Sequence, residues 1–190
     1  LLESAGAEGE NAFTNRDYTG YVQSLPVSSK RNNLDLIIGL ESDRMVNLIV
    51  DDSALDKERE VVQNERRYRN ENNPDGQLYE RIYELAFKKH SYHWPVIGYE
   101  EHLARAKSAE CYEFYKRFYA PNNAVIAVVG DVNPSDVMSK IEKAYGNIPS
   151  STIKRREIKT EPVQIAERRE TMRLKTQVEK LMIAFHSASG

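Results

Sequence analysis

The sequence predicts an α+β fold, an antiparallel-rich sheet with helices packed on one face, and three observations predict it. Residues 11–25 alternate bulky and polar side chains, as paired strands do. Between residues 33 and 118 apolar side chains recur every three or four positions, which is typical of amphipathic helices. Residues 124–129 form an uninterrupted apolar run with the length of a buried strand. Elements of these kinds bury their apolar faces by stacking helices on a sheet.

The composition suits a folded domain with neither a nucleic-acid partner nor a membrane span. Hydrophobic residues make up 40% of the 190 positions, enough for a core. The balance of 27 basic against 29 acidic residues gives no field that would gather nucleic acid or an anionic membrane. The longest apolar run, residues 124–129, is too short to cross a bilayer. The single cysteine, Cys111, excludes an intrachain disulfide and a multi-cysteine zinc site.

The two ends suggest that the sequence is a fragment of a longer protein. It opens at Leu1 with no initiator Met, no basic segment and no apolar signal segment. It stops shortly after the strand-like run 181–185, where a natural chain seldom ends. We therefore expect part of a larger protein rather than a complete one.

The first part of the chain predicts two strands followed by two helices. A turn at residues 15–17 divides the strand-like stretch into two short strands. The apolar stripe from Asn33 to Ile49 predicts the first helix, and Asp51–Ser53 ends it and caps the next one. Residues 54–73 predict a second helix of unusually high charge.

The rest of the chain predicts further helices around a buried strand. A turn cluster at residues 72–76 precedes a third helix over residues 78–86, and residues 90–98 are interpreted as a loop because they contain Trp94–Pro95. The remaining expected elements are a helix from Ser108 that Pro121 terminates, a strand at 123–130, a helix from Asn133 to about Tyr145, and strands at 167–175 and 179–187.

The histidines of this sequence form no recognisable metal motif. The spacing of His90 and His93 suits neither one helix face nor an inverted zinc-protease motif, so a surface loop is the favoured interpretation. The segment Gly98–His102 lacks the first histidine of H-x-x-E-H and is rejected as a zinc site. His186 lies alone in a strand-like run and is interpreted as a packed side chain.

Two acidic residues of the second predicted helix admit two interpretations. Glu58 and Glu65 lie seven residues apart, so both project from nearly one face, with Val61–Val62 between them. In one interpretation, which the helix alone favours, they belong to a solvated face and pair with its arginines, Arg59, Arg66 and Arg67. In the other, one carboxylate ligates a metal while the second holds a partner group in support.

Several blocks of sequence, in this order, carry a resemblance to a known family. They are Asn11–Thr14 with Asp17, Thr19 and Tyr21; Leu34–Leu36 leading to Glu41–Met45; Glu58–Arg59 with Val62 and Glu65; Trp94–Pro95 with Gly98; Phe118–Asn123; and Val129–Val132. The set covers nearly the whole chain and resembles the pitrilysin/insulinase family of zinc metallopeptidases. This family includes the mitochondrial processing peptidases and bacterial processing proteases.

The resemblance implies a fold, a cofactor and its ligands. It implies a partial pitrilysin-type lobe of the LuxS/metallopeptidase-like fold, with zinc held by two histidines of an H-x-x-E-H helix and by a downstream Glu. By the motif, that downstream ligand is Glu65, with Glu58 as its supporting carboxylate. The two histidines and the general-base Glu are expected upstream of Leu1. The zinc site is therefore incomplete in this sequence, and the chain alone is not expected to hydrolyse peptides.

The resemblance also implies how substrate binds. The strand bearing Asn11, Ala12 and Phe13 is similar to the family's edge strand, where an extended substrate adds as a further strand. Main-chain hydrogen bonds of this kind tolerate many sequences, so the expected substrate is a peptide or an unfolded protein. A second similar lobe or a partner subunit is expected to enclose it. Residues 1–152 are expected to form a partial N-terminal lobe half, and residues 153–190 the connection and first strands of the second half.

The function implied for the parent protein is that of a zinc metalloendopeptidase acting on extended polypeptides. The alternative is a non-catalytic family member that serves as a structural or substrate-holding partner subunit. The presence of both Glu58 and Glu65 favours the hypothesis of an active peptidase, because a subunit without zinc chemistry has no need of two acids on that face.

Overall fold

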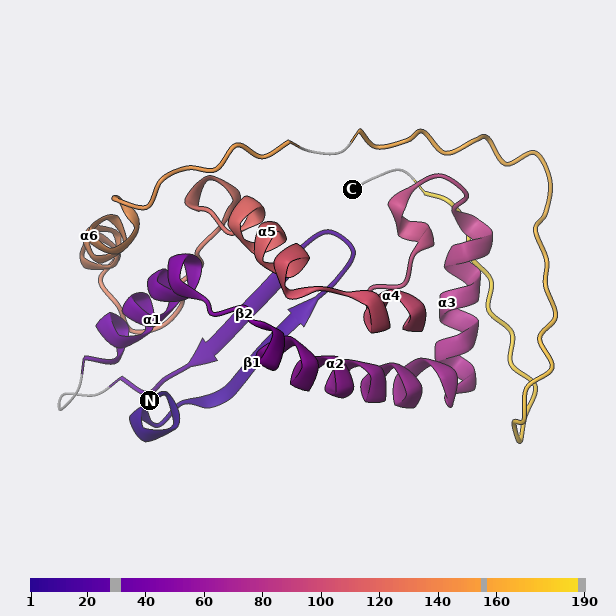
Figure 1. Cartoon of the computed structure of the whole chain (residues 1–190), viewed down its shortest axis with the longest axis horizontal. Helices are drawn as coiled ribbons and strands as arrows, with labels where there is room; N and C mark the ends of the chain where they lie inside the picture. Colours follow the sequence, from indigo (N-terminus) through magenta and orange to yellow (C-terminus); the bar gives the residue numbers. More distant parts are fainter. Residues whose placement is uncertain (28–31, 155–156, 188–190) are drawn as a thin grey trace. The chain divides into compact units, whose positions relative to one another are not determined.

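The computed structural model describes residues 1–27, 32–154 and 157–187, and Figure 1 shows its helices and strands. Contacts divide the chain into two compact units, each made from two separate stretches of sequence. Unit 1 comprises Leu1–Asp51 and Lys107–Lys154, and unit 2 comprises Asp52–Ala106 and Arg155–Gly190. The residues of each unit contact mainly other residues of the same unit.

Unit 1 is built from a β-hairpin and helices. Its elements are η1 (Glu3–Ala5), β1 (Glu8–Thr14), β2 (Thr19–Ser24), α1 (Asn33–Asn47), α5 (Ser108–Phe118), η4 (Pro121–Asn123) and α6 (Pro134–Tyr145). The predicted turn between the strands is confirmed, because Oδ1 of Asn15 accepts the N–H groups of Asp17 (2.8 Å) and Tyr18 (2.9 Å). The helices predicted in this part of the chain are also confirmed.

A β-bulge interrupts β1 just before the residues predicted to contact substrate. Glu8 pairs with Ser24 and Asn11 with Val22, so two residues of β1 face one residue of β2. Gly9 lies in this bulge with a φ of 67°, a left-handed conformation that glycine adopts without strain. Such a bulge bends the strand and increases its twist where the predicted substrate segment begins.

Two glycines of unit 1 provide a matched pair of stability predictions. Gly9→Ala is expected to lower the free energy of unfolding by about 1–2 kcal/mol, because the added Cβ has room but opposes the left-handed backbone. Gly39→Ala also adds a Cβ into open space, but within helix α1, and is expected to raise that free energy by about 0.5–1 kcal/mol. Urea unfolding followed by circular dichroism measures both. If both substitutions changed the free energy of unfolding in the same direction, the left-handed conformation of Gly9 in the bulge would be contradicted.

Helices cover one face of the hairpin, as predicted. Tyr21 and Gln23 lie two residues apart on β2 and so share a face. The amide of Gln23 donates to Glu41 of α1 (2.7 Å), and the guanidinium carbon of Arg44 lies 4.8 Å from the centroid of the Tyr21 ring. The hydroxyl of Tyr21 also lies 2.7 Å from that of Tyr119, just after α5. Helix α1 and the end of α5 therefore pack on the Tyr21 face.

The core of unit 1 is small and comes from the helices and the segments beside them. Its buried apolar residues are Ala5, Ile38, Tyr115, Ala120 and Val137. The hydroxyl of Tyr115 donates to the carbonyl of Arg44 (2.8 Å) and accepts the N–H of Leu48 (3.1 Å), which closes the C-terminal end of α1. Buried Asn33 donates to the carbonyl of Pro26 (2.8 Å) and ties the start of α1 to the chain after β2.

Unit 2 is a helical assembly in which the chain reverses direction through a tight turn. Its elements are α2 (Asp52–Arg66), the π-helical turn η2 (Arg67–Glu71), α3 (Pro74–Ala86), η3 (Ser91–His93) and α4 (Glu100–Arg105). A Cβ added to Gly76 would lie 2.0 Å from the carbonyl oxygen of Arg69, so α3 approaches η2 as closely as glycine permits. The sequence predicted α2 and α3 but not α4, which is too short to show a period.

The strand predicted at residues 123–130 is absent. Figure 1 draws this stretch as unpaired chain, with η4 extending into its first residue. Val125 and Val129 are each 97% exposed, so the prediction that the run is buried is wrong. An apolar run becomes a strand only when another segment pairs with its backbone, and within the described residues β1 and β2 alone are paired. No helix of the described chain is long and apolar enough to cross a membrane.

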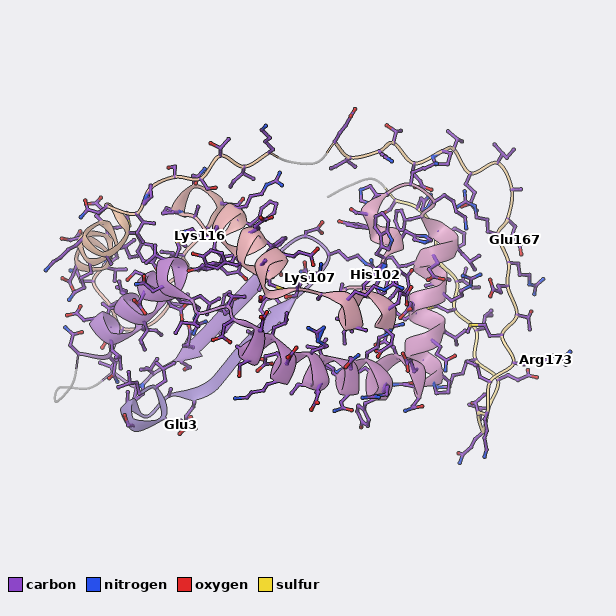
Figure 2. The ribbon with its side chains drawn as sticks, viewed as in Figure 1. Glu3, His102, Lys107, Lys116, Glu167 and Arg173 are labelled. Atoms are coloured by element: carbon purple, nitrogen blue, oxygen red, sulfur yellow. The ribbon has the colours of Figure 1, made fainter. Side chains whose placement is uncertain are left out.

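Residues 157–187 are likewise extended chain, and the strands predicted at 167–175 and 179–187 are not formed there. Most side chains of this segment are exposed, and Figure 2 shows Glu167 and Arg173 standing off the ribbon. Neither predicted strand forms, because no other segment of the described residues pairs with its backbone. The segment is held by side-chain contacts with the rest of unit 2 instead.

Candidate functional site

The residues predicted to form the site are divided between the two units. Asn11, Ala12 and Phe13 belong to unit 1, and Glu58 and Glu65 belong to unit 2. Each group has its own local environment, set by the elements of its unit.

The strand predicted to bind substrate is paired along one side only. β1 and β2 form a two-stranded antiparallel sheet, and the described residues add no third strand. The N–H of Asn15 donates to the carbonyl of Tyr18 (3.0 Å), which makes these residues a hydrogen-bonded pair. Hydrogen-bonded and non-hydrogen-bonded pairs alternate along such a ladder, so the main-chain groups of Ala12 and Thr14 point away from β2. The outer edge of β1 therefore presents the N–H and C=O of these two residues.

A hollow of about 250 Å³ lies beside Ala12, between the hairpin and helix α1. Its lining comes from the N-terminal segment, both strands and α1: Leu2, Asn11, Ala12, Tyr21, Val22, Gln23 and Arg44. Residues directly opposite each other in a sheet share a face, so Ala12 lies on the face of its partner Tyr21. Ala12, which lies on the edge strand, contributes only a methyl group to this lining.

Phe13, the third residue predicted to contact substrate, points to the opposite face of the hairpin. Successive strand residues alternate between faces. The Phe13 ring covers Gly20, where an added Cβ would lie 2.5 Å from the ring, and it meets the ring of Tyr18 edge-on. The structure thus brings Asn11 and Ala12 to the hollow but not Phe13.

Helix α2 uses one stripe of side chains to hold the segment around α4. Gln63 donates to the carboxylate of Glu100 (2.7 Å), and Arg66 donates to the carbonyl of Gly98 (2.6 Å). Arg59 donates to carbonyls at the C-terminal end of α4, those of Leu103 (3.1 Å), Ala104 (3.1 Å) and Ala106 (2.9 Å). A cation at this end complements the unpaired carbonyls of the helix.

Glu58 and Glu65 lie on another side of α2, two helical turns apart. Glu58 is exposed. The side chain of Glu65 is 38% exposed and forms an ion pair with Arg69 at 2.8 Å. The interpretation of a solvated face agrees with this exposure, but its named partners are wrong: Glu65 pairs with Arg69, and in the described residues arginines 59, 66 and 67 bind other groups.

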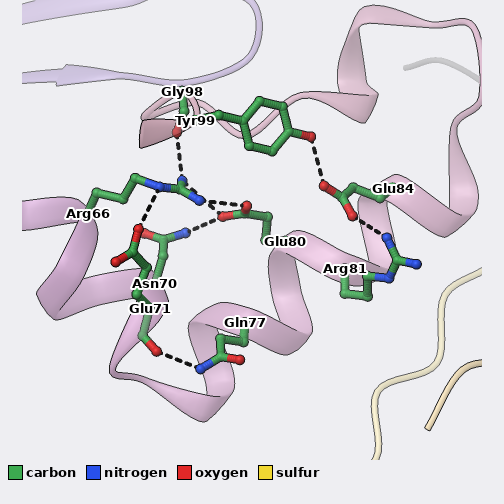
Figure 3. A network of polar contacts seen from close by, with 9 residues as sticks. All are labelled: Arg66, Asn70, Glu71, Gln77, Glu80, Arg81, Glu84, Gly98 and Tyr99. Carbon is green, nitrogen blue, oxygen red and sulfur yellow. Dashed lines mark hydrogen bonds and ion pairs between the residues drawn. The ribbon is translucent and has the colours of Figure 1, made fainter. Parts of the chain in front are cut away.

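Arg66 is the buried centre of unit 2, which corrects its assignment to a solvated face. Only 7% of the residue is exposed. Its guanidinium forms a two-pronged ion pair with Glu80 (3.0 and 3.2 Å) and reaches Glu71 (3.2 Å), as Figure 3 shows. Asn70 donates a further hydrogen bond to Glu80 (3.0 Å). The network fastens η2 and α3 to the end of α2, directly after Glu65.

Tyr99 and Glu84 form a second polar contact close to this network (Figure 3). The Tyr99 hydroxyl donates to Glu84 (2.7 Å), and Arg81 binds the other carboxylate oxygen. Burial and this hydrogen bond together raise the pKa of Tyr99 to about 12. Burial by itself would raise the pKa of Glu84, but the hydrogen bonds from Tyr99 and Arg81 outweigh it and lower the pKa. Glu84 is thus a charged anchor for Tyr99.

Glu161 anchors the extended segment to the chain that follows α3. Its carboxylate accepts the main-chain N–H groups of Lys88, Lys89 (2.7 Å) and His90 (2.9 Å). Burial opposes ionisation, but these three donors outweigh it and hold the pKa of Glu161 below its usual value.

Acid is expected to weaken unit 2 through Glu84 and Glu161. A carboxyl with a folded pKa below its unfolded value stabilises the fold above the unfolded pKa, and this contribution is lost as the pH falls through the folded pKa. The urea midpoint reported by the single tryptophan, Trp94, should therefore decrease from about pH 6 to about pH 3. Glu84→Gln should flatten the decrease, and an equally steep decrease in that variant would contradict the assignment.

The histidines do not gather into a metal site. Among the described residues, no group of three or more His, Cys, Asp or Glu side chains could hold a metal ion. His93 Nδ1 lies 2.8 Å from the carbonyl oxygen of Phe87, and His90 accepts the N–H of Tyr92 (3.2 Å), so both are held locally in the predicted loop. His186, expected to be packed, lies against the ring of Phe87 (5.3 Å between centroids), and its Nε2 lies 3.0 Å from the carbonyl oxygen of Ala86, but the residue is exposed rather than buried.

Comparisons with known proteins place these features in a family. The family described as "Peptidase M16 inactive domain" matches residues 106–190. The zinc protease PqqE of Helicobacter pylori is 33% identical over 138 residues, which cover 73% of this chain and 30% of PqqE. A solved protease from Helicobacter pylori is 31% identical with a TM-score of 0.72, over 85% of this chain and 37% of that one. The ferredoxin protease FusC, solved in complex with Arabidopsis ferredoxin, is 25% identical with a TM-score of 0.71, over 83% of this chain and 18% of that one.

The chain thus spans well under half the length of each of these proteins. Its α+β fold matches theirs, and the ordered blocks from Asn11 to Val132 agree with the names that these relatives carry. The chain therefore belongs to the M16 peptidases, the pitrilysin/insulinase family of zinc proteases.

Proposed function

We propose that the protein containing this chain is a zinc metalloendopeptidase that hydrolyses extended polypeptides bound as an added strand beside β1. The observation that carries the proposal is the free edge of β1, where Ala12 and Thr14 present main-chain groups without a partner strand in the described residues. Such an edge pairs readily with an extended chain. Because main-chain groups supply the binding, peptides and unfolded proteins of many sequences would be substrates.

Glu65 would supply one zinc ligand, with Glu58 supporting it. Carboxylate oxygens are ordinary zinc ligands, and the exposed ion pair of Glu65 with Arg69 is of a kind that contributes little stability, so a metal could displace it. Glu65 fits one position of a zinc site, but a catalytic zinc takes three protein ligands, and the described residues provide no such group.

Bound zinc polarises a carbonyl and lowers the pKa of its bound water to about 7. The part assigned to this chain is to hold one ligand at the end of α2 and to align the substrate main chain along β1. The chain alone would therefore be inactive. Donors from a longer protein would complete the site.

A second similar lobe or a partner subunit would enclose the substrate. The lengths of the relatives support this, because the chain covers only 30% of PqqE and 18% of FusC. In this proposal residues 1–152 form part of the first lobe half, and residues 153–190 begin the second half.

Ala12→Pro tests strand addition. Proline removes the N–H that faces the outer edge and leaves the N–H groups that face β2, so the hairpin should persist. The affinity for a fluorescent extended peptide, measured by anisotropy, is expected to fall at least about tenfold. Thr19→Pro, at an outward-facing position of β2, is the control and should bind normally. Unchanged affinity in Ala12→Pro would contradict the proposal.

A non-catalytic partner subunit is the second candidate. It is favoured by the description of the family that matches residues 106–190, an inactive domain. Such a subunit would bind the extended peptide beside β1 and yet contain no zinc. Metal analysis of the whole protein distinguishes the two candidates.

A further inference from the structure

We propose that the hollow beside Ala12 accepts an acidic side chain of the bound polypeptide and that Arg44 determines this preference. The inference rests on the proposed function, because it requires a peptide strand beside β1. It concerns which sequences bind well at a site whose main-chain contacts are otherwise indifferent to sequence.

Strand geometry directs one peptide side chain toward the hollow. An antiparallel strand added to the edge of β1 places one of its residues directly opposite Ala12, and opposite residues share a face. Ala12 shares its face with Tyr21, and both line the hollow together with Arg44. The side chain opposite Ala12 therefore extends across a single methyl group toward α1.

Arg44 is held in place but only partly satisfied. Its guanidinium carbon lies 4.8 Å from the centroid of the Tyr21 ring, which supports the planar group. Its Nη2 lies 3.3 Å from Oε1 of Glu41, and the same oxygen accepts a hydrogen bond from Gln23 (2.7 Å). A guanidinium has more N–H donors than this pair uses, and no further acceptor for Arg44 occurs among the described residues.

The chemistry of the hollow favours a carboxylate. The Arg44 side chain is 32% exposed and lines the hollow. Guanidinium and carboxylate form charge-assisted, often two-pronged hydrogen bonds that are stronger than neutral ones. Glu41 stays engaged by Gln23 and leaves part of the guanidinium uncommitted. A lysine at the same peptide position would meet a cation instead.

Peptides that differ at one position test the inference with the full chain. The probes are fluorescent peptides of Val and Thr that carry Glu, Gln or Lys at the centre, and anisotropy gives their affinities. The Glu peptide is expected to bind at least about tenfold more tightly than the Gln peptide, and the Lys peptide most weakly. Arg44→Met, which keeps an unbranched side chain over Tyr21, should reduce the Glu preference to about twofold or less, and Arg44→Lys should restore part of it.

The outcomes separate this inference from the proposed function. Equal affinity for the Glu and Gln peptides, or an unchanged preference in Arg44→Met, would overturn the role of Arg44 and leave strand addition standing. Failure of every peptide to bind, or normal binding by Ala12→Pro, would overturn strand addition itself. Circular dichroism of each variant shows that the comparison is made between folded chains.

Discussion

Arg66→Met is expected to lower the free energy of unfolding of unit 2 by about 3–5 kcal/mol. Methionine keeps the unbranched shape of the side chain but removes the cation that binds Glu80, Glu71 and a main-chain carbonyl. The Glu80 side chain is only 15% exposed, so its charge would be left with poor solvation and without its two-pronged partner. Removing one member of a buried ion pair costs more than replacing both, because the remaining charge is stranded.

The neighbouring residue offers a matched control. Arg67, the first residue of η2, is exposed and donates to Asn64 in the last turn of α2 (2.7 Å), so Arg67→Met should change the free energy of unfolding by no more than about 0.5 kcal/mol. Urea unfolding followed by Trp94 fluorescence measures both variants. Adding Glu80→Leu to Arg66→Met should recover part of the loss. Similar stabilities for the two arginine variants would show that the Arg66 network is not central to unit 2.

In a longer protein that supplies the H-x-x-E-H helix, Glu65→Gln is expected to abolish most peptidase activity. The amide keeps the shape of the side chain but removes the negative charge that makes a carboxylate a good ligand. Glu58 is proposed to support Glu65 rather than to bind zinc itself, so Glu58→Gln should lower activity by about 10–100-fold. Glu60→Gln is the control, because Glu60 is exposed on a different side of α2. The value of kcat/KM on an unfolded protein substrate measures all three.

Features that depend on neighbouring residues were predicted well. The hairpin turn is fixed by Asn15 acting on N–H groups two and three residues ahead. The apolar period of α1 and the proline that opens α6 are contained in single stretches of sequence. The seven-residue spacing of Glu58 and Glu65 is equally local, since the helix itself determines that they share a side.

Features that depend on distant partners were not predicted. The run 124–129 has strand composition, yet a strand requires a second segment to pair with it. Arg66 was assigned to a solvated face because its partner Glu80 lies beyond η2, where the helix period gives no information. The hollow was missed for the same reason, because Ala12 and Arg44 come from separate elements.

The zinc content of the whole protein carrying Glu65→Gln shows whether Glu65 is a zinc ligand. Metal analysis after removal of loosely bound zinc should find near-stoichiometric zinc in the wild type and in Glu60→Gln. We expect Glu65→Gln to lose most of that zinc, while its circular dichroism spectrum and unfolding midpoint match those of the zinc-free wild type. Normal zinc content in folded Glu65→Gln would contradict the assignment of Glu65 as a ligand.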